Sequence, residues 1–199
     1  MARMGEDATS AAMWQVGQEY LHTGDIDRSI EYFLIARQKD EEAKEPNVTG
    51  LLMLGSAYEA ADMYAEAEEV YQHIYTDIVP SAPEAYRAQV RVLLAVGRAA
   101  EAADLLKVAY SKTGVDNFRS QRLEILPEIP STSVTPGYYN AAQSIKLLQG
   151  QDCEIWYTLD KFAVLPQDGI LYEGTLELSE GEHQLRAVAV SGDLVSDIM

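Results

Sequence analysis

The side chains that could carry out chemistry are few and lie far apart in this chain. Its three histidines, His22, His73 and His183, fall in unrelated segments, and Cys153 is the only cysteine. A zinc site needs cysteine and histidine ligands at short regular spacings, and no such spacing occurs here. A single cysteine also excludes a disulfide within the chain. We therefore expect surface or turn histidines and no metal site.

The acidic residues are numerous but form no recognisable catalytic or calcium-binding pattern. Asp25 and Asp27 stand at a helix start, and the other ligands of a calcium loop do not follow them. A glycine-rich phosphate loop and the Gly-x-Ser-x-Gly turn of serine hydrolases are also missing from the sequence. Paired carboxylates for glycoside hydrolysis would need a supporting cleft. We expect a protein that is not an enzyme and uses no cofactor.

The chain is acidic along its whole length. Its net charge is −17, of which residues 1–118 carry −10 and residues 119–199 carry −7. Such a field repels phosphate backbones and anionic membranes, so we expect no nucleic-acid partner. No apolar run reaches the roughly 18 residues of a membrane-spanning helix, and residues 1–7 lack the apolar core of a secretory signal. We expect a soluble segment without membrane insertion.

One sequence pattern occurs three times in the first 112 residues and predicts the elements that carry most of the side chains in this part of the chain. The turn residues Gly24, Asp62 and Gly97 stand 38 and then 35 residues apart, each between two segments with helical apolar spacing. A helix, a turn and a second helix repeating about every 34 residues indicate a stacked α-solenoid. Solenoids of this kind usually bind other chains.

The apolar spacing predicts three helix pairs. The predicted helices span residues 10–22, 26–37, 48–60, 63–76, 83–96 and 99–110. Ser81 and Glu84 form a predicted capping box around Pro83 at the start of the third pair. Small residues are expected where two helices come close and large ones where a gap must be filled; they include Gly17, Gly55, Ala67, Ala102, Phe33 and Tyr71.

These residues resemble the tetratricopeptide repeat family over positions 10–114. The match is carried by Val16-Gly17-x-x-Tyr20 with Phe33, and by Leu54-Gly55-x-x-Tyr58 with Ala67 and Tyr71. Repeat three departs from the family, because Gln89-Val90 replaces the usual Leu-Gly. The resemblance implies a right-handed superhelix whose first helices line a concave groove. The partner-binding residues that this register implies are Trp14, Gln18, Ser56, Glu59, Arg87 and Arg91.

Two of these assignments leave alternatives open. Arg87 and Arg91 are four residues apart, so they share one helix face and could attract an anionic partner. They could instead pair with Glu84 or with acids of repeat two. Trp14 could anchor a partner in the groove or pack against N-terminal residues.

Some members of the family bind the acidic C-terminus of a chaperone. Their clamp uses basic and asparagine residues in the first two repeats. Trp14, Gln18 and Met53 stand at the matching positions of this chain. These residues do not provide the clamp, so we expect that this chain does not bind the C-terminus of a chaperone.

Extended structure is predicted after the repeats. Residues 115–126 could form a capping helix through Phe118, Leu123 and Leu126. Five period-two segments follow, separated by glycine-containing turns; they span 143–148, 154–159, 169–172, 175–178 and 184–190. Short strands at this spacing predict a small β-sandwich. Because its last edge strand would fall near residues 194–196, we also expect the natural chain to continue or the sequence to be truncated.

This second half resembles the immunoglobulin-like module at the C-terminus of chitobiases and β-hexosaminidases. The most specific stretch is Ile155-Trp156-Tyr157-Thr158-Leu159-Asp160, and Lys161-Phe162 departs from the family. The resemblance implies an accessory role, in an enzyme or a bacterial surface protein. Trp156 alternates with the expected core residues, so it could be exposed and stack on a sugar or a partner. The alternative is that a loop or the helical domain covers it.

The predicted fold class is multidomain α + β. It comprises an all-α helix-pair solenoid of three tetratricopeptide-like repeats at 8–114, a capping helix or linker at 115–126, and a small immunoglobulin-like β-sandwich at 127–199. The predicted function is a non-enzymatic scaffold that binds a peptide or protein in the groove. The alternative is an accessory carbohydrate- or envelope-associated module of a larger bacterial surface protein. A second copy could cover an exposed end of the three repeats, giving a homo-oligomer.

Overall fold

The computed structural model describes residues 9–150, 152–163 and 165–199. The chain divides into two compact units between Arg119 and Ser120, inside the segment expected to cap or link. Position 8, where the repeats were expected to begin, lies outside the described residues, as do residues 1–7. We describe the helical unit and the β unit separately.

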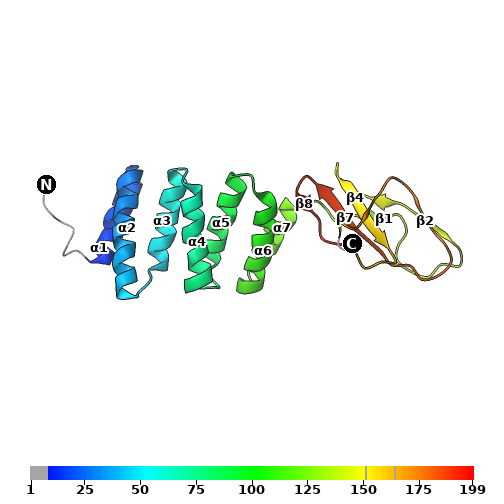
Figure 1. Ribbon diagram of the computed structural model, residues 1–199, viewed down its shortest axis with the longest axis horizontal. Helices are drawn as coiled ribbons and strands as arrows, with labels where there is room; N and C mark the ends of the chain where they lie inside the picture. Colours follow the sequence, from blue (N-terminus) through cyan, green and yellow to red (C-terminus); the bar gives the residue numbers. More distant parts are fainter. Residues whose placement is uncertain (1–8, 151, 164) are drawn as a thin grey trace. The chain divides into compact units, whose positions relative to one another are not determined.

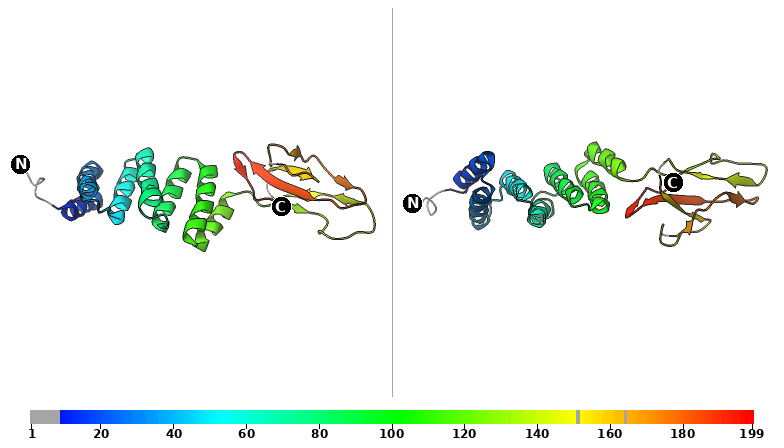
Figure 2. Two further views of the ribbon diagram at one scale, coloured as in Figure 1. Left: turned by 60° about the horizontal axis from the view of Figure 1, so that its bottom comes forward. Right: turned by 90° about the horizontal axis from the view of Figure 1, so that it is seen from above.

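The helical unit consists of stacked helix pairs. Its helices are α1 (Ser10–Thr23), α2 (Ile26–Ala43), α3 (Val48–Ala60), α4 (Tyr64–His73), the π-helix η1 (Ile74–Ile78), α5 (Pro83–Ala95), α6 (Ala99–Thr113) and the start of α7 (Asp116–Ile125). Each helix from α1 to α6 packs on the next, and α1 also contacts α3, which contacts α5. Figures 1 and 2 show these helices side by side in chain order. The three predicted helix pairs are confirmed.

The three turns inside the pairs have the same backbone geometry. Gly24, Asp62 and Gly97 all adopt left-handed conformations, with φ of 80°, 57° and 78°. In each turn the next backbone N–H bonds to the carbonyl five residues earlier, as from Asp25 to Tyr20. This hydrogen bond satisfies a carbonyl at the end of the first helix. The shared register of the turns, predicted from sequence spacing, is therefore confirmed.

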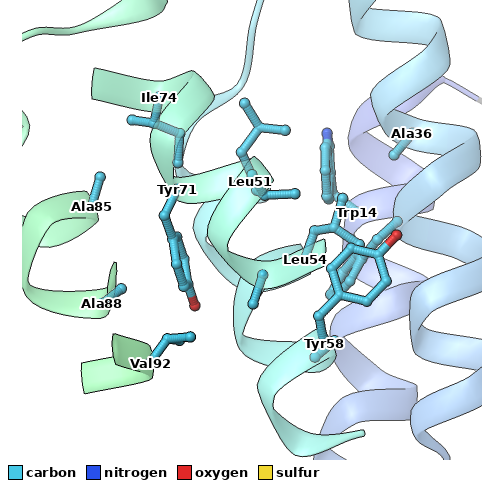
Figure 3. Packing of buried hydrophobic residues seen from close by; sticks show 14 of the residues in the cluster. Trp14, Ala36, Leu51, Leu54, Tyr58, Tyr71, Ile74, Ala85, Ala88 and Val92 are labelled. Carbon is cyan, nitrogen blue, oxygen red and sulfur yellow. The ribbon is translucent and has the colours of Figure 1, made fainter. Parts of the chain in front are cut away.

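Close approach within a pair depends on a glycine that faces an aromatic ring. A Cβ atom built on Gly17 would lie 2.5 Å from the Phe33 ring, and one on Gly55 would lie 2.4 Å from the Tyr71 ring. In the third pair the corresponding positions hold Val90 and Leu106, both buried. The third pair thus has a larger residue than glycine on its first helix and a smaller residue than the aromatic ring on its second helix. Figure 3 shows Tyr71 within the resulting core.

Two helix ends differ from expectation. The capping box at Ser81 is wrong, because Ala82 is the N-cap of α5 and makes no side-chain cap hydrogen bond; Pro83 does occupy the first turn. Helix α2 continues to Ala43, six residues beyond its predicted end at residue 37. Its 18 residues help to explain the longer spacing between the first two turns.

Helix α7 contributes one core residue to the helical unit. Phe118 is fully buried and meets Tyr86 edge-on, with ring centroids 6.4 Å apart. The expected capping contact of Leu123 is wrong, because its side chain is 51% exposed. Leu126 is buried, but it belongs to the β unit.

The β unit contains three small antiparallel sheets. Its strands are β1 (Ser131–Thr132), β2 (Gln143–Ile145), β3 (Leu147–Leu148), β4 (Glu154–Leu159), β5 (Ile170–Leu171), β6 (Leu176–Leu178), β7 (Leu185–Ser191) and β8 (Leu194–Val195). The sheets pair β1 with β3, β2 with β6, and β5-β4-β7-β8 in that order. All five predicted strand segments contain a strand. Strand β8 pairs with β7 at Leu194–Val195, where the last edge strand was expected.

One face of the four-stranded sheet packs against residues of the other two sheets. Ile155 of β4 and Ala187 of β7 cluster with Leu147 of β3, and Leu176 of β6 packs on them. The period-two alternation along β4 explains why Ile155 lies on this face and Trp156 on the opposite one. Within the residues that the structure describes, no helix is both long and apolar enough to cross a membrane.

Candidate functional site

The solvent-exposed faces of α1, α3 and α5 carry most of the predicted partner-binding residues. Gln18, Ser56 and Arg91 occupy the same register position, six residues before each turn, and all three are exposed. Glu59 and Arg87 lie beside them on α3 and α5. We call these five residues the first-helix face. Because α3 contacts both α1 and α5, the face is continuous across the three repeats.

An ion pair joins two repeats on this face. Arg91 donates through Nε and Nη2 to the two carboxylate oxygens of Glu59, at 2.8 and 2.7 Å. The hydroxyl of Tyr71 donates to the same carboxylate at 2.6 Å. Burial alone would raise the pKa of Glu59, but the hydrogen bonds from Arg91 and Tyr71 outweigh it and hold that pKa below its ordinary value. Burial, together with Glu59, raises the pKa of Tyr71, so its hydroxyl stays protonated.

Arg87 also has partners within the chain. Its guanidinium lies 3.3 Å from Glu84, and it stacks over the Phe118 ring at 5.4 Å from the centroid. The two arginines are therefore paired with Glu84 and with an acid of repeat two, which was the alternative to an anionic partner. With both positive charges compensated, the first-helix face is polar and largely neutral.

Trp14 does not belong to this face, and its assignment as a partner anchor is corrected. Its side chain is 4% exposed. Its ring packs on Phe33 at 5.3 Å and fits against Gly50, where a built Cβ would lie 2.4 Å from the indole. The indole N–H donates to Asp40 at 2.7 Å. These contacts come from α2 and α3, whereas the N-terminal residues of the expected alternative lie outside the described part of the chain.

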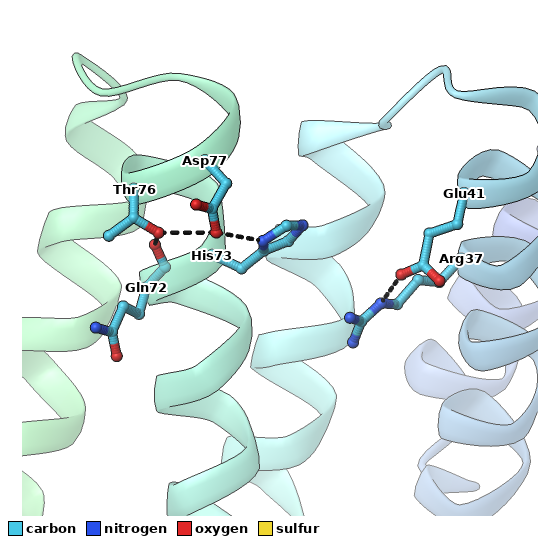
Figure 4. A network of polar contacts seen from close by, with 6 residues as sticks. All are labelled: Arg37, Glu41, Gln72, His73, Thr76 and Asp77. Atoms are coloured by element: carbon cyan, nitrogen blue, oxygen red, sulfur yellow. Dashed lines mark hydrogen bonds and ion pairs between the residues drawn. The ribbon is translucent and has the colours of Figure 1, made fainter.

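Asp40 is a buried carboxylate that the sequence did not reveal as special. It lies beyond the predicted end of this helix at residue 37, but α2 extends through it and turns it inward. The neighbouring surface of α2 and α4 is polar. Figure 4 shows Arg37, paired with Glu41 at 2.7 Å, and His73, paired with Asp77 at 2.8 Å, pointing toward one another between the two helices.

Trp156 in the β unit is half-buried. Its indole N–H donates to Glu154 at 3.1 Å. It pairs across strands with Val188, which is buried, and with Leu171 on the edge strand β5. Part of the ring therefore remains accessible. Among the described residues, no group of three or more histidine, cysteine, aspartate or glutamate side chains is placed to hold a metal ion.

No protein-family model matches the chain, and no curated protein matches its sequence. Solved structures with similar helices include the first tetratricopeptide repeat domain of Spaghetti (RPAP3) bound to the HSP90 peptide SRMEEVD. It is 17% identical, and the match covers 59% of this chain and 92% of that one with a TM-score of 0.48.

Two further structures match over a similar share of the chain. The Arabidopsis OM64 tetratricopeptide repeat domain is 15% identical, covering 58% of this chain and 92% of that one with a TM-score of 0.49. The Yersinia enterocolitica type III secretion chaperone SycD, in complex with a peptide of the translocator YopD, is 17% identical, covering 58% and 87% with a TM-score of 0.47. Tetratricopeptide repeat domains and chaperones are therefore among the structures that this chain is similar to.

Proposed function

We propose that this protein is a non-enzymatic scaffold whose helical unit binds a peptide or a protein on the first-helix face. The observation that carries the proposal is the continuous row of Gln18, Ser56 and Arg91, exposed at one register position of three successive repeats. The small, uncharged side chain of Ser56 at the centre of the row allows a partner backbone to approach closely. Polar groups on either side can fix its orientation through hydrogen bonds.

The residue set in this proposal is smaller than the sequence implied. Trp14 is omitted because it is buried. Glu59 and Arg91 act together as a paired group that accepts and donates hydrogen bonds, so an acidic peptide gains little from Arg91 alone. The proposed partner is therefore an uncharged or mixed-charge segment. Its binding surface would be the concave groove of a tetratricopeptide-like solenoid.

A steric block at the centre of the face tests the proposal. We expect Ser56→Arg to abolish capture of the natural partner, because a long cationic side chain would occupy the middle of the row. Ala65→Arg on α4 is the matched control, since Ala65 is also small, helical and exposed but lies outside the face. Partners recovered by affinity capture would be identified by mass spectrometry and compared between the two variants. Equal recovery by both variants would exclude the first-helix face.

For the β unit we propose an accessory role, as a spacer or a second contact surface of the immunoglobulin-like type. A carbohydrate contact at Trp156 is the second candidate function, and the observation that favours it is the accessible part of that aromatic ring. Binding on a glycan array that disappears in Trp156→Ala would support it. An array without signal for the unmodified chain would exclude it.

A further inference from the structure

A small hollow opens between α2, the start of α3, and α4 in the helical unit. Its volume is about 100 Å³. Trp14, Asp40 and Leu51 are its most buried lining residues, exposed by 4%, 9% and 4%. Figure 3 shows the Trp14 indole between Leu51 and Ala36. Gln18, Ser56, Glu59, Arg87 and Arg91 do not line it, so this inference can fail while the proposed function stands, and the reverse also holds.

The inner end of the hollow carries a negative charge that is not neutralised by a cation. The Asp40 carboxylate accepts one hydrogen bond, from the neutral Trp14 indole N–H at 2.7 Å. Within the described part of the chain it forms no ion pair, although it is nine-tenths buried. A buried carboxylate is costly unless a positive charge or several donors compensate it.

The charges nearer to solvent do not supply that compensation. Arg37 turns its Nε toward Glu41 at 2.7 Å, and His73 turns its Nδ1 toward Asp77 at 2.8 Å. Lys44 lines the hollow from an exposed position just after α2. The lining thus combines two apolar walls with the buried Asp40 anion. Nearer to solvent it adds the Arg37–Glu41 ion pair, His73 and the exposed cation Lys44.

We propose that this hollow binds the side chain of a lysine presented by a protein partner. The unbranched methylene stem would lie along Trp14 and Leu51, and the terminal ammonium would donate to the Asp40 carboxylate. The hollow is too small for a large planar ligand, and Asp40 repels a carboxylate or phosphate. The net charge of −17 attracts cationic partners before contact.

The two tryptophans of the chain allow a direct test by NMR on the full protein. Trp14 lines the hollow, whereas Trp156 lies in the β unit and serves as an internal control. We expect N-acetyl-lysine methylamide to shift the Trp14 indole N–H signal saturably while the Trp156 signal stays in place. The norleucine analogue keeps the stem without the charge, and the glutamate analogue reverses the charge; neither should shift the Trp14 signal. A static Trp14 signal with the lysine probe, or an equal shift with norleucine or glutamate, overturns the proposal.

Two variants test the charges separately. Asp40→Asn should abolish the response, provided that its circular dichroism shows a folded helical unit. Lys44→Ala leaves the buried residues intact, and removing a repelling charge at the rim should lower the dissociation constant of the lysine probe by about twofold or more. A site for an anion would respond in the opposite direction. A higher dissociation constant in Lys44→Ala therefore overturns the proposal even if Asp40→Asn does not fold.

Discussion

At the residue scale, the helix pairs depend on matched sizes at two positions 16 residues apart. Gly17 with Phe33 and Gly55 with Tyr71 place the larger residue on the second helix, whereas Val90 with Leu106 divides the volume more evenly. In all three pairs the residues at these two positions are buried. A change at one position should therefore be compensated by a change at the other.

We expect Gly17→Ala to destabilise the helical unit by about 1–3 kcal/mol, because the new methyl group would overlap the Phe33 ring. This loss should occur although alanine favours helix over glycine by about 1 kcal/mol. Adding Phe33→Leu should restore part of the loss, giving a non-additive double-mutant cycle. Urea unfolding followed by circular dichroism measures all four proteins. Ser56→Ala, at an exposed helical position, should remain within about 0.5 kcal/mol of the parent, and strictly additive changes would contradict the size-matching argument.

The Glu59–Arg91 pair predicts a stability that depends on pH. The pKa of Glu59 is held below its ordinary value of 4.5, so the folded state binds this proton less readily than the unfolded state. The contribution is fully present above pH 4.5 and is lost as the pH falls through the folded-state pKa. Glu59→Gln should cost about 1 kcal/mol at pH 7, a figure reduced for the exposure of Arg91.

The same substitution should cost nothing once both states are protonated. Denaturant unfolding between pH 7 and pH 3 would show the two proteins converging as the pH falls. Glu84→Gln is the control, because Glu84 is an exposed carboxylate on the neighbouring helix with one arginine contact. A constant difference between Glu59→Gln and the parent across this range would contradict the assignment.

At the scale of elements, α7 covers the last helix pair through a single buried ring. Phe118→Ala should destabilise the helical unit by about 3–5 kcal/mol, because it removes a fully buried aromatic side chain. Leu123→Ala on the same helix should change stability by less than about 0.5 kcal/mol, since Leu123 is 51% exposed. Thermal unfolding of the two variants measures the difference. Similar losses in both would show that α7 packs through its other face.

The elements that sequence predicted well are those set by local chemistry. Gly24 and Gly97 mark left-handed turns because glycine has no Cβ to clash there, and Asp62 tolerates the same conformation. The strands were predicted from period-two runs such as residues 154–159, which form β4, although burial along β4 does not alternate strictly. These signals lie within a few residues of the feature that they predict.

The features that sequence missed depend on contacts between distant segments. Trp14 has the spacing of an outward-facing residue, but α2 extends far enough to bring Asp40 to its indole N–H, 26 residues away. Arg91 meets Glu59 from 32 residues away. Pairing with acids of repeat two was one of the predicted alternatives, but the sequence of its own helix could not decide between that pairing and a partner. In the same way, strand positions were predicted but their pairing into three sheets was not.

At the scale of the whole molecule, each unit has its own buried cluster and one tryptophan. Leu54 and Tyr71 belong to the cluster of the helical unit, while Ile155 and Ala187 belong to that of the β unit. Trp14 and Trp156 can therefore report on the two units separately. Removing a charge that stabilises only one unit should change the melting temperature reported by the tryptophan of that unit and leave that of the other tryptophan unchanged.

A histidine in the β unit provides such a charge. His183 Nδ1 lies 2.7 Å from the Asp160 carboxylate, which also accepts a hydrogen bond from the Gln184 backbone N–H. The hydrogen bond to Asp160 raises the pKa of His183 above 6.5, and the one from His183 lowers the pKa of Asp160 below 3.8. The contribution of His183 to the stability of the β unit is present below pH 6.5 and is lost as the pH rises through the folded-state pKa of His183. The contribution of Asp160 is present above pH 3.8 and is lost as the pH falls through the folded-state pKa of Asp160.

The pair should therefore stabilise the β unit most between about pH 4 and 6.5. We expect the melting temperature reported by the Trp156 indole N–H signal to be higher at pH 5.5 than at pH 8.5. His183→Gln should reduce this difference, because glutamine cannot gain a proton in that range, while the Trp14 melting temperature should be the same in the variant and the parent at each pH. NMR spectra recorded against temperature measure both signals in one sample. If His183→Gln lowered both melting temperatures equally, the two units would unfold as one, and the contribution of His183 would extend beyond the β unit.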